Sequence, residues 1–311
     1  MSLQDCLPAE LRGPTTTLTR ISAGLSGAAV HRVDAGGRAF VLKVAAGSEP
    51  LDGWRRAREI LERAAGAGLA PRVVHVDEER RAIVSELIVD RSFARLLAGP
   101  ESRAGAVALI GRTLRRVHEL PVPSAGQGGA ALDFLAGIMA ELSRVALPTF
   151  VGEAAARLTG EAAPVSERAP VLSHNDVNPS NLVYDGERLM LLDWDRAGPN
   201  DPFYDPATIA VFARMDDETC RALLAAYDGG AVAALPARFV YDRRLVAVVC
   251  GVVLLHLAQL AGHAGERAAT LDDTLGLGAF YQRMRAGTVS VASAEGRWRF
   301  GLALLKESTA L

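Results

Sequence analysis

The pattern of apolar residues changes once along the chain, near residue 90, and this change most limits the possible folds. Before it, short β-branched runs separated by glycine-containing turns predict strands, with one segment of helical periodicity among them. The predicted strands cover 15–21, 28–34, 38–45, 73–76 and 82–88, and the predicted helix covers 51–67. Strands followed by helices predict an α+β fold with two lobes.

Helical periodicity dominates the rest of the chain. The predicted helices cover 92–119, 131–145, 151–160, 217–227, 235–262 and 270–285, and the clear strands there are 182–184 and 189–193. We therefore predict a β-rich N-lobe over residues 1–89 and an α-rich C-lobe over residues 90–311. Residues 245–262 carry no formal charge and are just long enough to span a membrane. His256 and Gln259 lie inside this stretch, which favours a buried core helix.

Composition excludes several classes of partner. The net charge is −2, so there is no strong global field to attract nucleic acid or an anionic membrane, and we predict no nucleic-acid partner. Cys6, Cys220 and Cys250 are far apart, which argues against a disulfide framework or a zinc site and fits a reducing cytosol. The N-terminus has no basic segment followed by an apolar one, so we expect no signal peptide and a cytoplasmic location.

All four asparagines of the chain lie between residues 175 and 200. Within this stretch His174, Asp176 and Asn181 have H-x-D-x-x-x-x-N spacing, and Asp193 and Asp195 follow after one short hairpin. Amide and carboxylate oxygens suit Mg²⁺, and a carboxylate can also accept a proton. We predict that Asp176 accepts the proton of an attacking hydroxyl. Asn181 can turn its amide oxygen toward a metal, and Asp193 can bridge the metal to phosphate.

Two features of the first 60 residues suggest phosphate binding. Lys43 is one of only two lysines and lies in a predicted strand, where a compact ammonium can meet phosphate oxygens. The turn SAGLSGAA at 22–29 is rich in small residues, whose backbone N–H groups can approach an anion closely. It can equally be a plain hairpin. Glu59, or Glu62 one turn later, could pair with Lys43, although either could be a solvated helix charge.

Several motifs together resemble the aminoglycoside phosphotransferase and choline kinase superfamily, which has a protein-kinase-like fold. The resemblance runs from about residue 20 to about 230 and rests on the motifs SAGLSGAAV, VLKV, VSELI, RRVHELPVP, HNDVNPSN and LLDWDRAG. It implies an enzyme, a small-molecule kinase that uses ATP and Mg²⁺ as cofactors.

The resemblance also implies roles for individual residues. Gly24, Ser26 and Gly27 would cover the nucleotide phosphates through backbone amides. Lys43 would contact the α- and β-phosphates and be held by Glu59, and the backbone of Glu86, Leu87 and Ile88 would receive adenine. Asp176 would be the catalytic base, Asn181 and Asp193 the Mg²⁺ ligands, and His174 a brace for the loop.

Two details resemble the choline and ethanolamine kinase branch: the triplet His174-Asn175-Asp176, and Asn200 with Asp201 and Asp205 in GPNDPFYDPA. Asp195 departs from the pattern, because many members carry glutamate there. The two details that resemble the choline and ethanolamine kinase branch lead us to expect an amino alcohol, such as choline or ethanolamine, as the hydroxyl acceptor. The alternatives are an antibiotic-inactivating O-phosphotransferase and a nucleotide-binding pseudokinase scaffold. Candidate acceptor-binding aromatics are Trp194, Phe203, Tyr204, Tyr227, Tyr241, Phe280, Tyr281 and Trp298, with Asp195, Asp201 and Asp242 as counter-charges.

Overall fold

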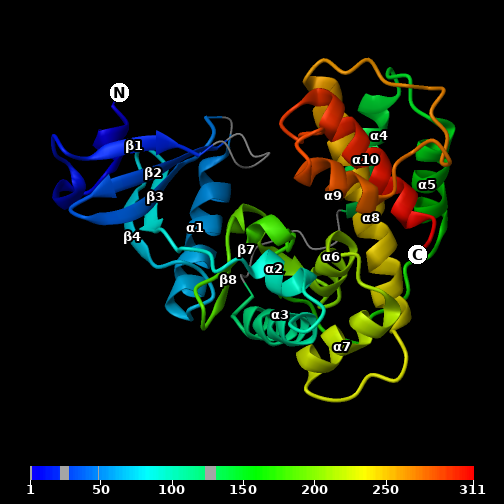
Figure 1. Ribbon diagram of the computed structural model, residues 1–311, viewed down its shortest axis with the longest axis horizontal. Coiled ribbons are helices and arrows are strands. Elements are labelled where there is room, and N and C mark those ends of the chain that lie inside the picture. The colour runs from blue at the N-terminus through cyan, green and yellow to red at the C-terminus, as the bar shows by residue number, and fades with distance from the viewer. Residues whose placement is uncertain (1, 22–27, 48, 123–130) are drawn as a thin grey trace. The chain divides into compact units, whose positions relative to one another are not determined.

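The computed structural model describes residues 2–21, 28–47, 49–122 and 131–311 (Figure 1). The chain forms two compact units. Unit 1 contains Met1–Pro121 and Pro179–Ala197, and unit 2 contains Val122–Asn178 and Gly198–Leu311. These two units differ from the lobes predicted from the sequence, which meet between residues 89 and 90, and that lobe boundary stays a prediction.

Unit 1 is built on a five-stranded antiparallel sheet with strand order β1-β2-β3-β5-β4. The strands are β1 (Thr17–Arg20), β2 (Ala29–Ala35), β3 (Arg38–Val44), β4 (Val73–Asp77) and β5 (Ala82–Glu86). Phe40 and Leu42 of β3 are buried in the same core cluster as Val84 of the neighbouring β5. Because side chains alternate along a strand, Lys43 lies on the opposite face of the sheet from these two residues.

The remaining elements of unit 1 are mostly helical. They are α1 (Leu51–Gly66), α2 (Phe93–Ala98), α3 (Arg103–His118), the 3-10 turns η1 (Leu3–Cys6), η2 (Ala9–Leu11), η3 (Pro179–Asn181) and η4 (Trp194–Arg196), and the hairpin β7 (Leu182–Tyr184) and β8 (Leu189–Leu191). Helix α1 buries Trp54, Ala57, Ile60 and Ala64, a spacing typical of an amphipathic helix. The hairpin packs against α2 and α3.

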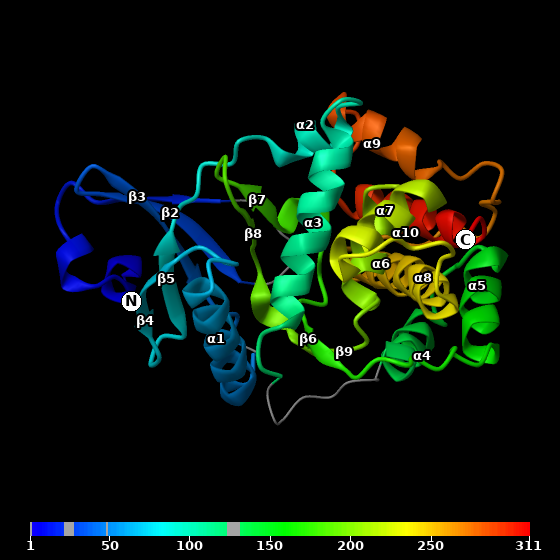
Figure 2. The same cartoon turned by 90° about the horizontal axis from the view of Figure 1, so that it is seen from below.

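Unit 2 is a helical assembly with one short two-stranded ladder. Its elements are α4 (Ala131–Leu142), α5 (Thr149–Gly160), β6 (Val171–Ser173), β9 (Gly198–Asn200), α6 (Tyr204–Phe212), α7 (Asp217–Asp228), α8 (Ala237–Leu260), α9 (Leu277–Arg285) and α10 (Ala294–Ser308). Helices α4, α5, α6 and α10 all pack against α8 (Figures 1 and 2). The core of the unit therefore forms around α8.

Helix α8 is long and apolar enough, by length and composition alone, to cross a membrane. It is the one such helix in the part of the chain that the structure describes, and 61% of its apolar window is buried inside the structure. Burial of this extent is typical of a core helix.

The segment 92–119 is two helices rather than the single helix expected. Gly99 has extended backbone angles (φ −76°, ψ 131°) and ends α2, and Pro100 follows it. Proline disfavours helical angles in the residue before it and has no N–H to continue the hydrogen-bond ladder. A proline inside a periodic pattern therefore explains this correction.

The sequence pattern did not predict four elements of unit 2, namely α6, α10, β6 and β9. Helix α6 buries seven of its nine residues, so it has no polar face to reveal a period. Strand β9 is Gly-Pro-Asn, a poor strand sequence, and forms only because it pairs with β6. The segment expected to be helical over 270–285 becomes a helix only at Leu277, after the Gly276 N-cap.

Helices α8 and α10 cross at two glycines. A Cβ built on Gly301 would lie 2.7 Å from the Gly251 carbonyl oxygen and 2.9 Å from Leu255 Cδ2. Gly301→Ala is therefore expected to lower the free energy of unfolding by about 1–3 kcal/mol, because backbone in a packed core cannot move aside. Gly152 in α5 has nothing within 4 Å of such a Cβ. Gly152→Ala should instead stabilise by roughly 0.5–1 kcal/mol. Urea unfolding of both variants measures this contrast, and equal stability of the two would contradict it.

Candidate functional site

In unit 1, the β7–β8 hairpin places Asn181 and Asp193 near each other. Leu182 pairs with Leu191, and beyond this pair the Leu192 N–H donates to the Asn181 carbonyl at 2.8 Å. Asn181 and Asp193 therefore flank the open end of one hairpin. Asp193 has left-handed backbone angles (φ 64°, ψ 66°), which are uncommon outside glycine. Such strain clusters at functional sites.

Lys43 joins this end of the hairpin. Its Nζ lies 2.6 Å from Asp193 Oδ1 and 2.7 Å from Asp195 Oδ2. Burial by itself would lower the pKa of Lys43, but the two carboxylates outweigh it and raise the pKa above its ordinary value. Burial also raises the pKa of Asp195, against the opposing charge of Lys43. Two carboxylates thus converge on one cation.

This donor set fits a divalent metal. The ammonium of Lys43 shows that the Asp193 and Asp195 carboxylates can face a shared cation, and Asn181 directly precedes the neighbouring strand β7. Carboxylate and amide oxygens are ligands that Mg²⁺ accepts, with phosphate oxygens and water completing its shell. Among the described residues no cluster of three or more His, Cys, Asp or Glu could hold a metal alone.

Glu59 does not reach Lys43. Glu59 and Glu62 pair with Arg58 instead, at 3.6 and 3.8 Å. The acidic residue that sequence reasoning missed here is Glu49, in the turn before α1. Its pKa is raised by burial and then by the charge of Asp195, against the opposing charge of Lys43. Without a helical period or motif, nothing in the sequence marked Glu49. A nucleotide-binding role for Glu59 stays a prediction.

The other predicted nucleotide contacts lie at two places in unit 1. Gly24, Ser26 and Gly27 fall outside the described residues. Glu86 ends β5, and its N–H and that of Leu87 already donate to the carbonyls of Arg72 and Ala39. The binding of adenine by the backbone of Glu86, Leu87 and Ile88 stays a prediction.

In unit 2, a buried carboxylate holds the backbone of the segment that leads into Asp176. His174 and Asn175 follow β6, and their backbone N–H groups donate to Asp205 Oδ2 and Oδ1 at 2.7 and 2.8 Å. His174 and Asp205 are both 0% exposed. A carboxylate that accepts two backbone donors is a strong, well-oriented anchor. Sequence reasoning noted Asp205 only as part of a motif, because its partners lie 30 and 31 residues away.

Asp176 lies next to this anchor and accepts a hydrogen bond at Oδ1 from Asn178 Nδ2 at 2.9 Å. The Asn178 N–H also donates to the Asp176 carbonyl at 2.9 Å, so the segment turns tightly here. The catalytic base predicted from the sequence is therefore held by its own loop. The chain passes into unit 1 between Asn178 and Pro179, before it reaches Asn181.

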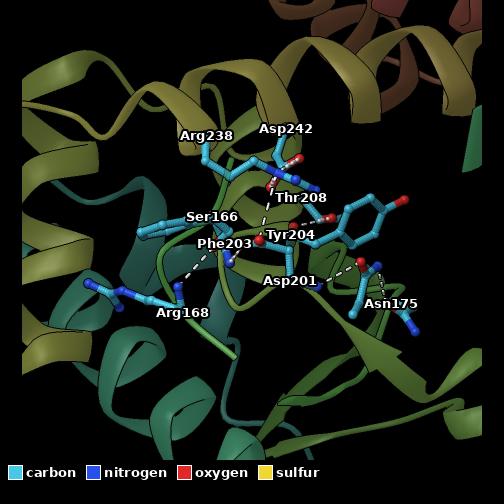
Figure 3. Close-up of polar contacts among 10 residues, drawn as sticks. Ser166, Arg168, Asn175, Asp201, Phe203, Tyr204, Thr208, Arg238 and Asp242 are labelled. Carbon is cyan, nitrogen blue, oxygen red and sulfur yellow. Dashed lines mark hydrogen bonds and ion pairs between the residues drawn. The ribbon is translucent and has the colours of Figure 1, made fainter. Parts of the chain in front are cut away.

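A polar network continues from this loop to α8 (Figure 3). Asn200 Nδ2 donates to Asn175 Oδ1 at 2.8 Å, and the Asp201 N–H donates to Asn200 Oδ1 at 2.8 Å. Arg238 Nε lies 3.8 Å from Asp201 Oδ2 and donates to both Asp242 oxygens, at 2.9 and 3.1 Å. Figure 3 shows Arg238 and Asp242 reaching from α8 toward Asp201.

In this network two carboxylates share one guanidinium, and burial raises the pKa of Asp242 from 3.8 to about 7, against the attraction of Arg238. At pH values between these two pKa values, Asp242 is protonated in the folded chain and ionised in the unfolded chain. The free energy of unfolding contributed by Asp242 must therefore fall as the pH rises through this window, and level off above it.

Asp242→Asn removes this titration. We expect wild type to gain roughly 2 kcal/mol relative to Asp242→Asn between about pH 8 and about pH 5. Urea unfolding of both proteins at the two pH values measures this difference, and a pH-independent difference would contradict the prediction.

Most of the aromatic residues considered for acceptor binding are core residues. Trp194, Phe203, Tyr227, Tyr241, Phe280 and Trp298 are buried, whereas Tyr204 and Tyr281 are partly exposed. The Tyr281 hydroxyl donates to the Phe212 carbonyl at 3.0 Å, which gives it a structural contact. Asp195, considered as a counter-charge, pairs with Lys43.

A strand-rich N-terminal region and a helical C-terminal region define the two-lobe, protein-kinase-like fold, and comparison with solved structures confirms this prediction. The structure is similar to a choline/ethanolamine kinase family protein from Mesorhizobium loti, with 21% identity, coverage of 95% of this chain and 94% of that one, and a TM-score of 0.58. It is also similar to the spectinomycin phosphotransferase APH(9)-Ia bound to ADP and spectinomycin, with 13% identity, coverage of 95% of this chain and 94% of that one, and the same TM-score of 0.58. At these identities the likeness shows the fold alone.

The chain belongs to the phosphotransferase enzyme family (APH), which matches residues 17–243. A shorter match joins it to the protein LicA of Haemophilus influenzae, 41% identical over 54 residues, which are 17% of this chain and 20% of LicA. The resemblance noted in the sequence is thus confirmed: the chain is a member of a phosphotransferase family. A nucleotide-binding pseudokinase scaffold stays an alternative from the sequence.

Proposed function

We propose that this chain transfers the γ-phosphate of ATP, with Mg²⁺, to a hydroxyl group of an amino alcohol such as choline or ethanolamine. The observation that carries the proposal is the pairing of Lys43 with Asp193 and Asp195 at the end of the hairpin that also bears Asn181. This pairing supports a role for Lys43 in binding phosphate, next to oxygen atoms that would hold a phosphate-bridging metal. Membership of the phosphotransferase family supports the same reaction.

Each residue has one proposed role. Asp176 orients the acceptor hydroxyl and takes its proton, while Asn178 holds the Asp176 carboxylate in place. Lys43 binds phosphate oxygens once nucleotide competes for it, and Asn181 and Asp193 hold Mg²⁺. The bound metal would neutralise charge on the β- and γ-phosphates. Because the transition state of phosphoryl transfer is loose, positioning and charge neutralisation account for most of the catalysis.

The acceptor assignment rests on the His-Asn-Asp triplet and on the similarity to a choline/ethanolamine kinase family protein. The second candidate is an antibiotic-inactivating phosphotransferase, which the equal structural similarity to the spectinomycin phosphotransferase supports. A cytoplasmic location and the lack of a nucleic-acid partner stay predictions from the sequence.

An acceptor panel tests the proposal. The full chain is incubated with ATP and Mg²⁺ and with choline, ethanolamine, thiamine, kanamycin or spectinomycin, and the products are identified by mass spectrometry. Phosphocholine or phosphoethanolamine formed only when Mg²⁺ is present supports the proposal. A phosphorylated antibiotic without either product would establish the second candidate. If no member of the panel is phosphorylated, the amino-alcohol assignment is wrong.

A further inference from the structure

Asn175, the residue directly before Asp176, has a left-handed backbone conformation. Its φ is +64°, in the left-handed region that residues other than glycine occupy at a cost. The backbone direction at Asn175 decides where the next side chain, that of Asp176, points. Whatever holds Asn175 therefore influences the position of the proposed base.

The side-chain amide of Asn175 is held at both ends. Its Oδ1 accepts from Asn200 Nδ2 at 2.8 Å, and its Nδ2 lies 3.4 Å from the Gly198 carbonyl. Both partners belong to β9, which pairs with β6, the strand that leads into Asn175. The side chain of Asn175 is thus fixed to the same ladder that fixes its backbone.

Asn200 is itself oriented so that its donor faces Asn175. Its Oδ1 accepts the Asp201 N–H at 2.8 Å, which directs its Nδ2 toward Asn175. Asp201 is held in turn, because its carboxylate accepts the Phe203 N–H at 2.9 Å and lies 3.8 Å from Arg238 of α8. An asparagine amide offers both a donor and an acceptor, and this position uses both.

We propose that Asn200 is a positioning residue for Asp176, acting through the Asn175 amide to hold the left-handed turn that directs the proposed base. This inference rests on the proposed function of Asp176. Asn200 acts at a distance from the reaction, since its contacts are with Asn175 and Asp201. An aspartate at this position would still accept the Asp201 N–H. It would have no donor for Asn175 and would set two oxygens against each other.

The test compares Asn200→Asp, Asn175→Gly and the double variant with wild type. Glycine tolerates a φ of +64°, so Asn175→Gly removes the amide without adding backbone strain. Ser166→Ala is the control, because Ser166 accepts only a weak bond from the Arg168 N–H at 3.4 Å, in an exposed part of the same unit. Two readouts are used: Mg²⁺-dependent hydrolysis of ATP, with water as acceptor, and hydrogen exchange of the amides of residues 174–178.

We expect Asn200→Asp to lower kcat about tenfold with an unchanged KM for ATP, and to speed amide exchange by a similar factor. Since both residues act through one contact, the double variant should be no slower than the more affected single variant. Ser166→Ala should match wild type. Unchanged kcat or unchanged exchange in Asn200→Asp, or multiplying effects in the double variant, would overturn the proposal.

Asp176→Asn separates this inference from the function on which it rests. If Asp176→Asn retains full hydrolysis, the role of Asp176 itself is wrong. If Asp176→Asn loses hydrolysis while Asn200→Asp keeps it, only the positioning role of Asn200 fails. The exchange measurement needs no acceptor, so unchanged exchange in Asn200→Asp overturns the proposal even where hydrolysis is slow.

Discussion

Asp176→Asn should lower kcat for phosphoryl transfer by a factor of about 10²–10⁴, while MgADP binds with unchanged affinity. An asparagine keeps the size of the side chain and can still accept a hydrogen bond from Asn178, but it cannot take a proton from the acceptor hydroxyl. The loss should therefore appear in the chemical step. Steady-state kinetics with the acceptor found by the panel, together with calorimetric titration of MgADP, measures both quantities.

The matched control for this prediction is Asp133→Asn. Asp133 lies on the exposed side of α4 in the same unit as Asp176, and the substitution makes the same change of charge and shape. It should leave kcat and nucleotide affinity unchanged. If Asp176→Asn turns over as fast as Asp133→Asn, Asp176 is not the base. If it loses MgADP affinity as well, its effect extends beyond the proton transfer.

Asp205→Ala should destabilise the protein by roughly 2–5 kcal/mol and also lower kcat, because it removes the acceptor of one buried and one partly buried backbone N–H group. Those groups belong to His174 and Asn175, which lead directly into Asp176. Asp205→Asn keeps one acceptor oxygen and should lie between alanine and wild type in both properties. Urea unfolding and kinetics at a temperature where each variant is folded measure the two effects separately.

Asp216→Ala is the control for this second prediction. The Asp216 carboxylate also accepts a backbone N–H, that of Thr219 at 2.8 Å, but it caps α7 rather than holding the segment that carries Asp176. Loss of such a cap costs about 0.5–2 kcal/mol. It should leave kcat unchanged in the folded protein. If Asp205→Ala also keeps the wild-type kcat, Asp205 is a purely structural residue.

Local patterns predicted the elements in which the sequence strongly favours one conformation. The five strands of the sheet and helix α1 were expected from alternation and helical period, and each is present with small shifts at its ends. Helix α6 and strand β9 were not expected, because a fully buried helix has no period and Gly-Pro-Asn is a poor strand. These elements exist because their surroundings in unit 2 hold them.

The same distinction holds within the site. The motif spacing predicted Asp176, Asn181 and Asp193, because short-range geometry on one loop and one hairpin is encoded by neighbouring residues. It could not show that Lys43 would meet Asp193, 150 residues later, rather than Glu59. Two helical glutamates were compatible with the period, and only packing decided that both would face Arg58.

The sequence by itself thus determined the family, and it predicted the reaction and the residues that we propose carry it. These conclusions depend on residue type and short spacing, which can be read from the sequence without knowing how the chain packs. Only the tertiary structure showed what holds those residues: Asp205 beneath the His174–Asn175 backbone, Asn200 against Asn175, and Asp195 beside Lys43. Each of these contacts joins segments that are distant in the sequence, and such contacts form only when the core has brought the segments together.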